Sequence, residues 1–251
     1  MARENAFFKQ AAQLKEKLLS SMLPGQADAF IKILNAIFSF INRIRIQNSR
    51  LTASISNTTI VDIELEPLIG SKIDMTFNMK ESILNQLKRI KGNLDVLIQH
   101  DSNTRTYIVT NGKLDVVLPE AMSIPIPVLP DFTNANVIAA TVETDEASSI
   151  KQHFKNSSYA NIAVFVNQLG YFERHDGDRF YLGEFSMFEY KSIKPTYLFR
   201  SYTFLPFDSE SVSFSIFELR NCPKMYCLST VINLGFNMKI TTYERLTLIW
   251  R

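Results

Sequence analysis

The sequence has 251 residues, which is enough for one large domain or two small ones. Hydrophobic residues make up 46% and charged residues 21%, values that exclude an intrinsically disordered chain. The net charge is only +2, from 27 Lys and Arg against 25 Asp and Glu, which excludes nucleic-acid binding by bulk attraction. Any contact with nucleic acid must therefore come from a local basic patch.

The sequence carries no signal for secretion or membrane insertion. Its start, MARENAFFKQ, lacks a basic segment followed by an apolar run and a small-residue cleavage site. The longest apolar stretch, residues 29–41, is interrupted by polar residues and is shorter than the about 20 residues that span a bilayer. Cys222 and Cys227 have no histidine near them, so they predict free thiols rather than a zinc site or a disulfide framework. We expect a cytoplasmic protein that has no contact with a membrane.

The first part of the chain predicts two helices. Helical spacing of apolar residues predicts one helix over residues 5–22, which Pro24 and Gly25 end, and another over residues 26–41. The second helix is apolar nearly all round apart from one polar stripe. The stripe consists of Asp28, Lys32, Asn35 and Ser39.

The next segment changes to the period-two alternation of strands. This alternation predicts short strands over residues 43–66, joined by Asn and Ser turns, and one more over residues 73–77. A helix over residues 79–91 follows, which Gly92 ends in a left-handed cap. Three further strands are expected at 94–99, 106–110 and 113–118, the last two joined by the hairpin signal Asn111-Gly112.

Residues 119–136 carry four of the nine prolines, which predicts an extended, semi-rigid connector. After it the order of elements repeats, with a strand over residues 137–143 and a helix over 145–156. The second helix of this repeat falls at residues 208–222, where apolar residues alternate with serines as in a strand, but the repeat favours a helix. Further strands are expected at 161–168, 170–175, 180–188, 197–204, 225–232, 238–243 and 246–250.

The chain is thus predicted to be an α+β protein of two repeated domains, each with two helices packed on antiparallel sheets. The predicted division is an N-terminal helical extension over residues 1–24, domain 1 over 25–118, the connector over 119–136 and domain 2 over 137–251.

The order and spacing of these elements resemble those of the DNA sliding clamps, namely the proliferating-cell nuclear antigens and especially the shorter clamps of T-even phages. Three stretches carry the resemblance, which covers about residues 26–250: INRIRIQNSRLTASISNTTIVDIEL, KESILNQLKRIKGNLDVLIQH and the connector with its IPIPVLP. None of them is a signature motif. The resemblance implies the DNA clamp fold, in which helices line a central hole for double-stranded DNA and the sheets lie outside.

The resemblance also implies a function in DNA replication without enzymatic activity. Such a processivity factor, or polymerase accessory protein, tethers the replicative DNA polymerase and is placed on DNA by a clamp loader. With two domains per chain the ring would be a homotrimer with head-to-tail contacts. A phage source would put the protein in the host cytoplasm.

Two features depart from the family: the first unit opens with an extra helix in place of a leading strand, and the net charge is slightly positive. These departures leave room for a monomeric clamp-fold processivity factor like those of herpesviruses. A phage structural protein of the virion is the alternative from another class. An enzyme acting on nucleic acid would need a carboxylate cluster that the sequence lacks.

The exposed faces of the predicted helices supply candidate DNA contacts. On the helix over residues 79–91 the 100° step places Lys88 and Arg89 opposite the apolar face, and the resemblance turns them toward the hole. Solvated helix faces are the ordinary alternative. The candidates for sequence-independent DNA binding are Lys32, Asn35, Lys88, Arg89, Lys91, Lys151 and Lys155.

The connector is too apolar for a free linker, so some of its apolar residues should pack on the sheet. The resemblance implies a partner pocket between the connector and the C-terminus, which accepts a short apolar and aromatic peptide. Trp250 could equally be ordinary core in a last strand. The candidate partner-binding residues are Ile126, Val128, Leu129, Phe132, Ile249 and Trp250.

No motif predicts catalysis, a metal or a cofactor. The tetrapeptide 175–178, His-Asp-Gly-Asp, is typical of a hairpin turn, because four consecutive residues at a tip cannot converge on one ion. No nucleophile elbow, Cys-His pair or phosphate-binding glycine loop occurs.

Overall fold

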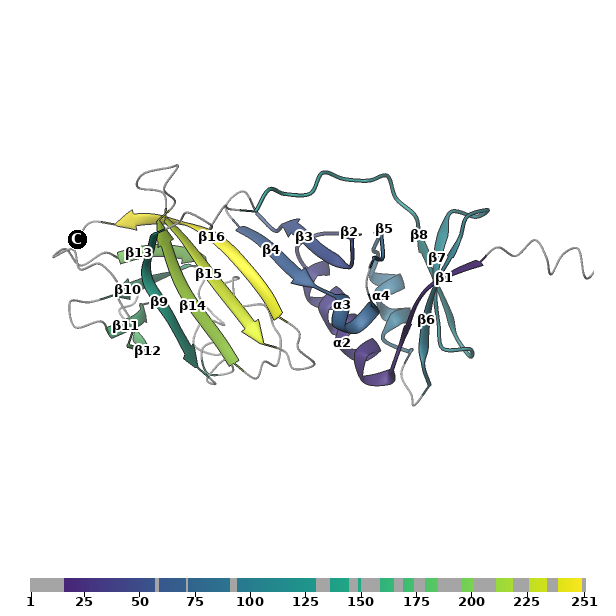
Figure 1. The fold of residues 1–251 in the computed structure, drawn as a ribbon, viewed down its shortest axis with the longest axis horizontal. Coiled ribbons are helices and arrows are strands. Elements are labelled where there is room, and N and C mark those ends of the chain that lie inside the picture. Colours follow the sequence, from purple (N-terminus) through teal and green to yellow (C-terminus); the bar gives the residue numbers. More distant parts are fainter. Residues whose placement is uncertain are drawn as a thin grey trace, which may run out of the picture. The chain divides into compact units, whose positions relative to one another are not determined.

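The computed structural model describes residues 16–56, 59–70, 72–90, 94–129, 136–144, 149, 159–164, 169–173, 179–184, 196–200, 211–218, 226–233 and 239–249. The chain divides into two compact units, whose helices and strands are labelled in Figure 1. Residues 1–51 and 65–125 form the first unit, and residues 52–64 and 126–251 form the second. The predicted domains at residues 25–118 and 137–251 stay a prediction, because these compact units do not define domain boundaries.

The first unit contains a four-stranded antiparallel sheet in the order β1-β6-β7-β8. These strands are β1 (Glu16–Met22), β6 (Val96–Asp101), β7 (Thr106–Thr110) and β8 (Asp115–Pro119). The predicted hairpin at Asn111-Gly112 joins β7 and β8, but the connection is longer than predicted, because β8 begins at Asp115. In it Gly112 has a φ of 78°, and the Asn111 side chain accepts hydrogen bonds from the backbone N–H groups of Lys113 and Leu114.

The helix predicted over residues 5–22 is wrong for its second half, where the chain forms β1. Residues 1–15 lie outside the described part. In β1, Ser20 and Met22 are buried on one face while Ser21 between them is exposed, a period of two. Pairing with β6 outweighs the helical preference of the Lys and Leu residues. The described part of the first unit therefore begins with a strand.

A second group of strands in this unit includes β2 (Arg43–Gln47), β5 (Met75–Asn78) and the start of β3 (Arg50–Ser54). β2 pairs antiparallel with both neighbours. Asn48 and Ser49 have φ values of 49° and 58°, so they form the two-residue turn whose backbone twist matches that of a hairpin. The Ser49 hydroxyl donates to the Gly70 carbonyl and accepts from the Ile73 N–H, which fixes this turn to the loop before β5.

Three helices lie on one face of the four-stranded sheet (Figure 1). α2 (Pro24–Phe38) begins at Pro24, a residue predicted to end a helix, because proline fits the first turn, where N–H groups lack helical partners. α3 (Glu66–Ile69) is a single turn that the sequence did not predict. α4 (Glu81–Leu87) ends four residues earlier than expected, and Gly92 lies outside the described residues.

The core of the first unit lies between these helices and the strands. Ile33, Leu34 and Ile37 of α2 are fully buried, as are Ile44 of β2 and Phe77 of β5. Burial of each such side chain contributes about 1.5–3 kcal/mol. This packing holds α2 and α4 in fixed positions.

The second unit is built on antiparallel strands. One series of paired strands runs in the order β12-β11-β10-β13-β16-β4. β16 also pairs with β15, which pairs with β14, and β14 pairs with β9. The strands are β4 (Thr59–Glu64), β9 (Asn136–Thr144), β10 (Tyr159–Val164), β11 (Leu169–Glu173), β12 (Arg179–Glu184), β13 (Thr196–Arg200), β14 (Ser211–Glu218), β15 (Tyr226–Asn233) and β16 (Lys239–Ile249).

The helix predicted over residues 208–222 is wrong, because β14 occupies this place. β14 pairs with β15 on one side and β9 on the other. Val212 and Phe214 are buried, and the serines between and beside them are half-buried, so the two-residue period in the sequence outweighed the repeat. The two strands predicted over residues 238–250 are the single strand β16. The helix predicted over residues 145–156 lies outside the described residues except for Ser149.

The buried Cys227 thiol in β15 gives a testable prediction. Only 4% of this side chain is exposed, and burial, reinforced by the charge of Glu244, raises its pKa to about 12. Since the thiolate is the reactive form, a native Cys222→Ser variant should not react with Ellman's reagent at neutral pH, whereas the denatured chain should release one equivalent.

The raised pKa of Cys227 also predicts how the free energy of unfolding changes with pH. The folded thiol stays protonated above its ordinary pKa of 9.0, so stability is unaffected below about pH 9 and falls as the pH rises toward 12. The slope should reach about 1.4 kcal/mol per pH unit. Denaturation of Cys222→Ser and Cys222→Ser/Cys227→Ala over this range checks the prediction, which equal slopes would contradict.

Candidate functional site

The exposed stripe of α2 is the one predicted from the sequence. Asp28, Lys32, Asn35 and Ser39 are all exposed, whereas Ile33 on the opposite side is fully buried. The stripe arises because every third or fourth residue of an otherwise apolar helix is polar. The prediction for this helix face is confirmed.

The exposed face of α4 is also as predicted. Asn85, Lys88 and Arg89 are exposed, while Leu84 and Leu87 are buried. Lys88 caps the helix, and its backbone N–H donates to the Leu84 carbonyl at 3.0 Å. The helix therefore presents two consecutive cations at its C-terminal end, where the helix dipole favours positive charge.

A groove of about 290 Å³ brings the two helix faces together. It is lined by Lys32 and Asn35 of α2 and by Lys88, which lies more than fifty positions further along the sequence, with Asp28 and Ile31 completing it. Three of the predicted DNA-binding residues thus share one groove. Arg89 is exposed beside Lys88 but does not line the groove, and Lys91, Lys151 and Lys155 lie outside the described residues.

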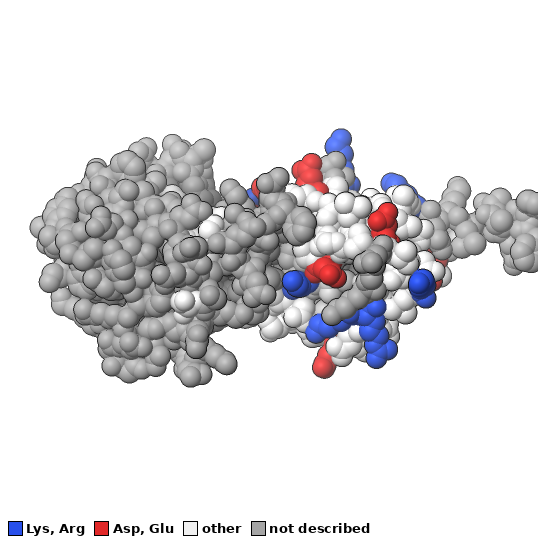
Figure 2. All heavy atoms as spheres, turned by 90° about the horizontal axis from the view of Figure 1, so that it is seen from below, with Lys and Arg blue, Asp and Glu red and all other residues white. Residues whose placement is uncertain are grey.

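The charges in this groove suit weak contacts with phosphates. Two lysines face one aspartate, and the single apolar lining residue, Ile31, is buried. Lysines and an amide can bind phosphate oxygens without reading bases. Where Figure 2 shows described residues of the first unit, Lys and Arg are interspersed with Asp and Glu instead of forming one continuous basic surface.

The first residues of the connector are hydrogen-bonded to the first unit. The Ala121 N–H donates to the Thr76 carbonyl of β5 at 2.8 Å, and the Glu120 N–H donates to the Arg105 carbonyl at 3.0 Å. The Arg45 guanidinium donates to the Ile124 carbonyl. These bonds place residues 120–124 beside β5, and of the apolar connector residues Ile124 is half-buried there.

The side chain of Glu120 adds a polar cluster at this point. Its carboxylate oxygen lies 3.4 Å from Nε2 of His100 and 3.9 Å from Nε of Arg105. The His100 ring also packs against Tyr107, with ring centroids 4.9 Å apart. Sequence reasoning missed this cluster, since its members come from β6, β7, the turn between these strands and the connector, and no local pattern predicts their meeting.

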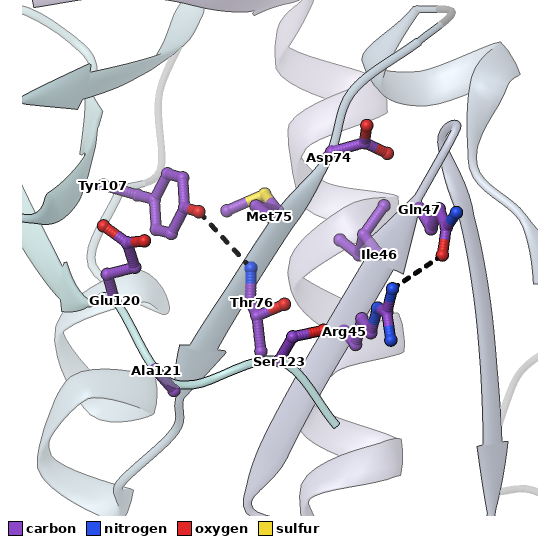
Figure 3. Close-up of a pocket in the computed structure, with 10 residues that line it drawn as sticks. All are labelled: Arg45, Ile46, Gln47, Asp74, Met75, Thr76, Tyr107, Glu120, Ala121 and Ser123. Carbon is purple, nitrogen blue, oxygen red and sulfur yellow. Dashed lines mark hydrogen bonds between the residues drawn. The ribbon is translucent and has the colours of Figure 1, made fainter. Parts of the chain in front are cut away.

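A polar pocket of about 280 Å³ lies next to this cluster, between β2, β5 and the connector (Figure 3). Burial raises the pKa of Tyr107, the neighbouring carboxylates of Glu120 and Asp74 raise it further, and the hydrogen bond from the Thr76 N–H opposes them. The Tyr107 hydroxyl is therefore neutral. The lining residues are Arg45, Ile46, Gln47, Asp74, Met75, Thr76, Tyr107, Glu120, Ala121 and Ser123.

The rest of the described connector is exposed and apolar. Val128 is 90% exposed and Ile126 36%, while Leu129 is half-buried. Met122, which the sequence did not single out, is 81% exposed. Phe132 and Trp250 lie outside the described residues, and Ile249 ends β16 with a side chain outside the described part.

The described residues carry no group of three or more His, Cys, Asp and Glu side chains that could hold a metal ion. The tetrapeptide 175–178 lies outside them, although the strands on either side of it, β11 and β12, do pair. None of the helices in the described part of the chain is long and apolar enough to cross a membrane.

The fold itself has close structural counterparts. No protein-family model matches the sequence, and neither does any curated protein. A solved structure of the PCNA2–PCNA3 complex from Sulfolobus tokodaii superimposes with a TM-score of 0.66 and 14% identity, over 90% of this chain and 98% of that one. The proliferating cellular nuclear antigen of Entamoeba histolytica gives a TM-score of 0.63 and 13% identity, over 92% and 99%.

The chain has the DNA sliding-clamp fold. The superposition spans nearly all of the chain and of its neighbours, so the clamp fold covers both units. The predicted α+β class with helices on antiparallel sheets is thereby confirmed. The leading strand β1 also removes one of the two departures from the clamp pattern that the sequence suggested.

Proposed function

We propose that this protein is a DNA sliding clamp, a processivity factor that encircles duplex DNA and tethers a replicative DNA polymerase. The observation that carries the proposal is the groove between α2 and α4, which joins Lys32, Asn35 and Lys88 on the helical face of a clamp fold. Cations that bind phosphates without base contacts would hold DNA and still let the protein move along it.

The strand order supports the proposal of a ring of three copies. Among the described strands, β8 pairs only with β7 in the first unit and β12 only with β11 in the second, so each has one open edge, as do β1 and β9 at the other ends of these strand orders. Open edges readily pair with another chain. One edge in each unit fits the two different surfaces that a head-to-tail homotrimer requires.

The exposed connector supports a partner site for polymerase and clamp loader. Ile126 and Val128 present apolar side chains on a segment whose beginning is fixed by hydrogen bonds. A preorganised apolar strip binds a peptide with a smaller ordering cost than a free linker does. The resemblance to the shorter T-even clamps points to the replication system of a phage.

The assembly is tested in solution. At micromolar concentration we expect sedimentation equilibrium to give three times the subunit mass, and negative-stain images to show a ring with a central hole. A monomer alone would favour a monomeric clamp-fold processivity factor, and fibres or very large particles would favour a structural protein of the virion.

A further inference from the structure

The outer face of the β1-β6-β7-β8 sheet carries the apolar side chains of Leu18, Leu97, Ile108 and Val117, with the polar Gln99 among them. Register places Leu18 of β1 opposite Gln99 of β6, Gln99 opposite Ile108 of β7, and Ile108 opposite Val117 of β8. Paired residues of antiparallel strands point to the same face. The row therefore crosses the whole sheet, and Leu97 lies beside it on the same face.

This face is exposed in the described structure. Leu18 is 55% exposed and Val117 47%, and Ile108 and Leu97 are half-buried. The neighbouring residues Val116 and Leu118 point to the other face and are buried. Figure 1 shows the described helices on that buried side only. A contiguous exposed apolar patch normally marks a docking surface.

The chain itself supplies an occupant of suitable chemistry. Residues 1–15 lie outside the described part, and they join β1 at Glu16, two positions before Leu18. Their apolar residues Phe7, Phe8, Ala11 and Leu14 have helical spacing, with Lys9 and Gln13 on the opposite side. These residues belong to the part of the helix predicted over residues 5–22 that β1 does not replace.

The width of the sheet matches the length of a helix that residues 1–15 could form. Four strands about 4.8 Å apart span about 14 Å, and a helix of ten residues is about 15 Å long. Because β1 is the edge strand, a turn after the helix is enough to bring the segment back over the sheet. We propose that residues 1–15 dock as an amphipathic helix across the outer face of this sheet, with Phe7 and Phe8 against the row from Leu18 to Val117.

Cysteine cross-linking of the full chain tests the proposal. In a Cys222→Ser background, Phe8→Cys/Val117→Cys is oxidised with copper phenanthroline and the linked peptides are identified by mass spectrometry. The matched control is Phe8→Cys/Asn85→Cys, whose second thiol is exposed on α4 on the other side of the sheet. We expect at least a roughly tenfold higher yield of intrachain disulfide for the Val117 pair, because docking raises the effective concentration.

Limited proteolysis tests the same docking independently, without introducing a cysteine. Docking should protect Lys9 from trypsin, and Val117→Asp should speed cleavage there about fivefold or more, since cleavage follows the undocked population. Lys113→Asp should leave the rate unchanged. Equal cross-linking in both pairs, or cleavage unaffected by Val117→Asp, would overturn the proposal, and disulfides only between chains would assign the face to a second copy instead.

Discussion

Replacing Lys32 and Lys88 by glutamate should weaken the binding of duplex DNA by at least roughly tenfold at low salt, which is about 1.4 kcal/mol. Both side chains line the groove between α2 and α4 and both are exposed. The change reverses two charges that line the same groove, so under the proposed function phosphates there would meet repulsion instead of attraction. In a ring of three copies the loss is repeated in each subunit.

Fluorescence anisotropy with two short duplexes of unrelated sequence measures this effect. The parent protein should bind both equally and weakly, and its affinity should fall steeply as salt is added, because each phosphate contact releases counterions. The double variant should bind less tightly and show a smaller dependence on salt. Adding Arg89→Glu should weaken binding further if the exposed face beyond the groove also contacts DNA.

The matched control reverses the same number of charges elsewhere in the first unit. Lys17 lies near the start of β1 and Lys113 in the turn before β8, and both are exposed outside α2 and α4. Lys17→Glu/Lys113→Glu should retain most of the DNA affinity, and circular dichroism should show both variants folded. Equal losses in the two variants would mean that only net charge matters, and the groove would then have no special part in binding.

The helix faces could be predicted because their signal is local. The stripe of α2 and the exposed face of α4 follow from which positions are polar at a period of 3.6 residues, and both are observed. The groove that joins Lys32 to Lys88 depends on how two distant helices pack on one sheet. No spacing in the sequence predicts that packing, and the resemblance to sliding clamps implied only that the helices line one surface.

Two segments predicted to be helical form the strands β1 and β14 instead. The first prediction followed a local pattern and the second followed the repeat. Residues 16–22 have helix-forming Lys and Leu, yet pairing with β6 decides their structure. For residues 211–218 the alternation of apolar residues with serines was the correct signal, and the expectation of a second helix overrode it. Burial alternates with a period of two over residues 20–22 and 211–215, as in a strand with one face on the core.

The anchoring of the connector could not be predicted in detail. Proline content predicted an extended segment, but the bond from Arg45 to the Ile124 carbonyl joins residues 79 positions apart. Arg45 alternates with buried Ile44 and Ile46 in β2, which predicts only that its side chain leaves the core. Its partner on the connector depends on the path of the chain after β8.

The apolar connector residues should carry much of the partner affinity. Replacing Ile126 and Val128 by serine is expected to weaken binding of a labelled peptide from the C-terminus of the cognate polymerase by about thirtyfold, or about 2 kcal/mol. The physical reason is that an anchor side chain of the peptide loses the apolar surface that it buries. Val128 is 90% exposed in the free protein, so its substitution removes little internal packing.

Stability and binding can be separated in this experiment. Leu94→Ser is a suitable control, because Leu94 is 42% exposed and lies before β6, away from the connector in sequence. The control should keep full peptide affinity, and all variants should retain the thermal midpoint and oligomeric mass of the parent. Unchanged affinity in Ile126→Ser/Val128→Ser with an intact assembly would show that the partner peptide binds elsewhere, and the connector would then act only as the link from β8 to β9.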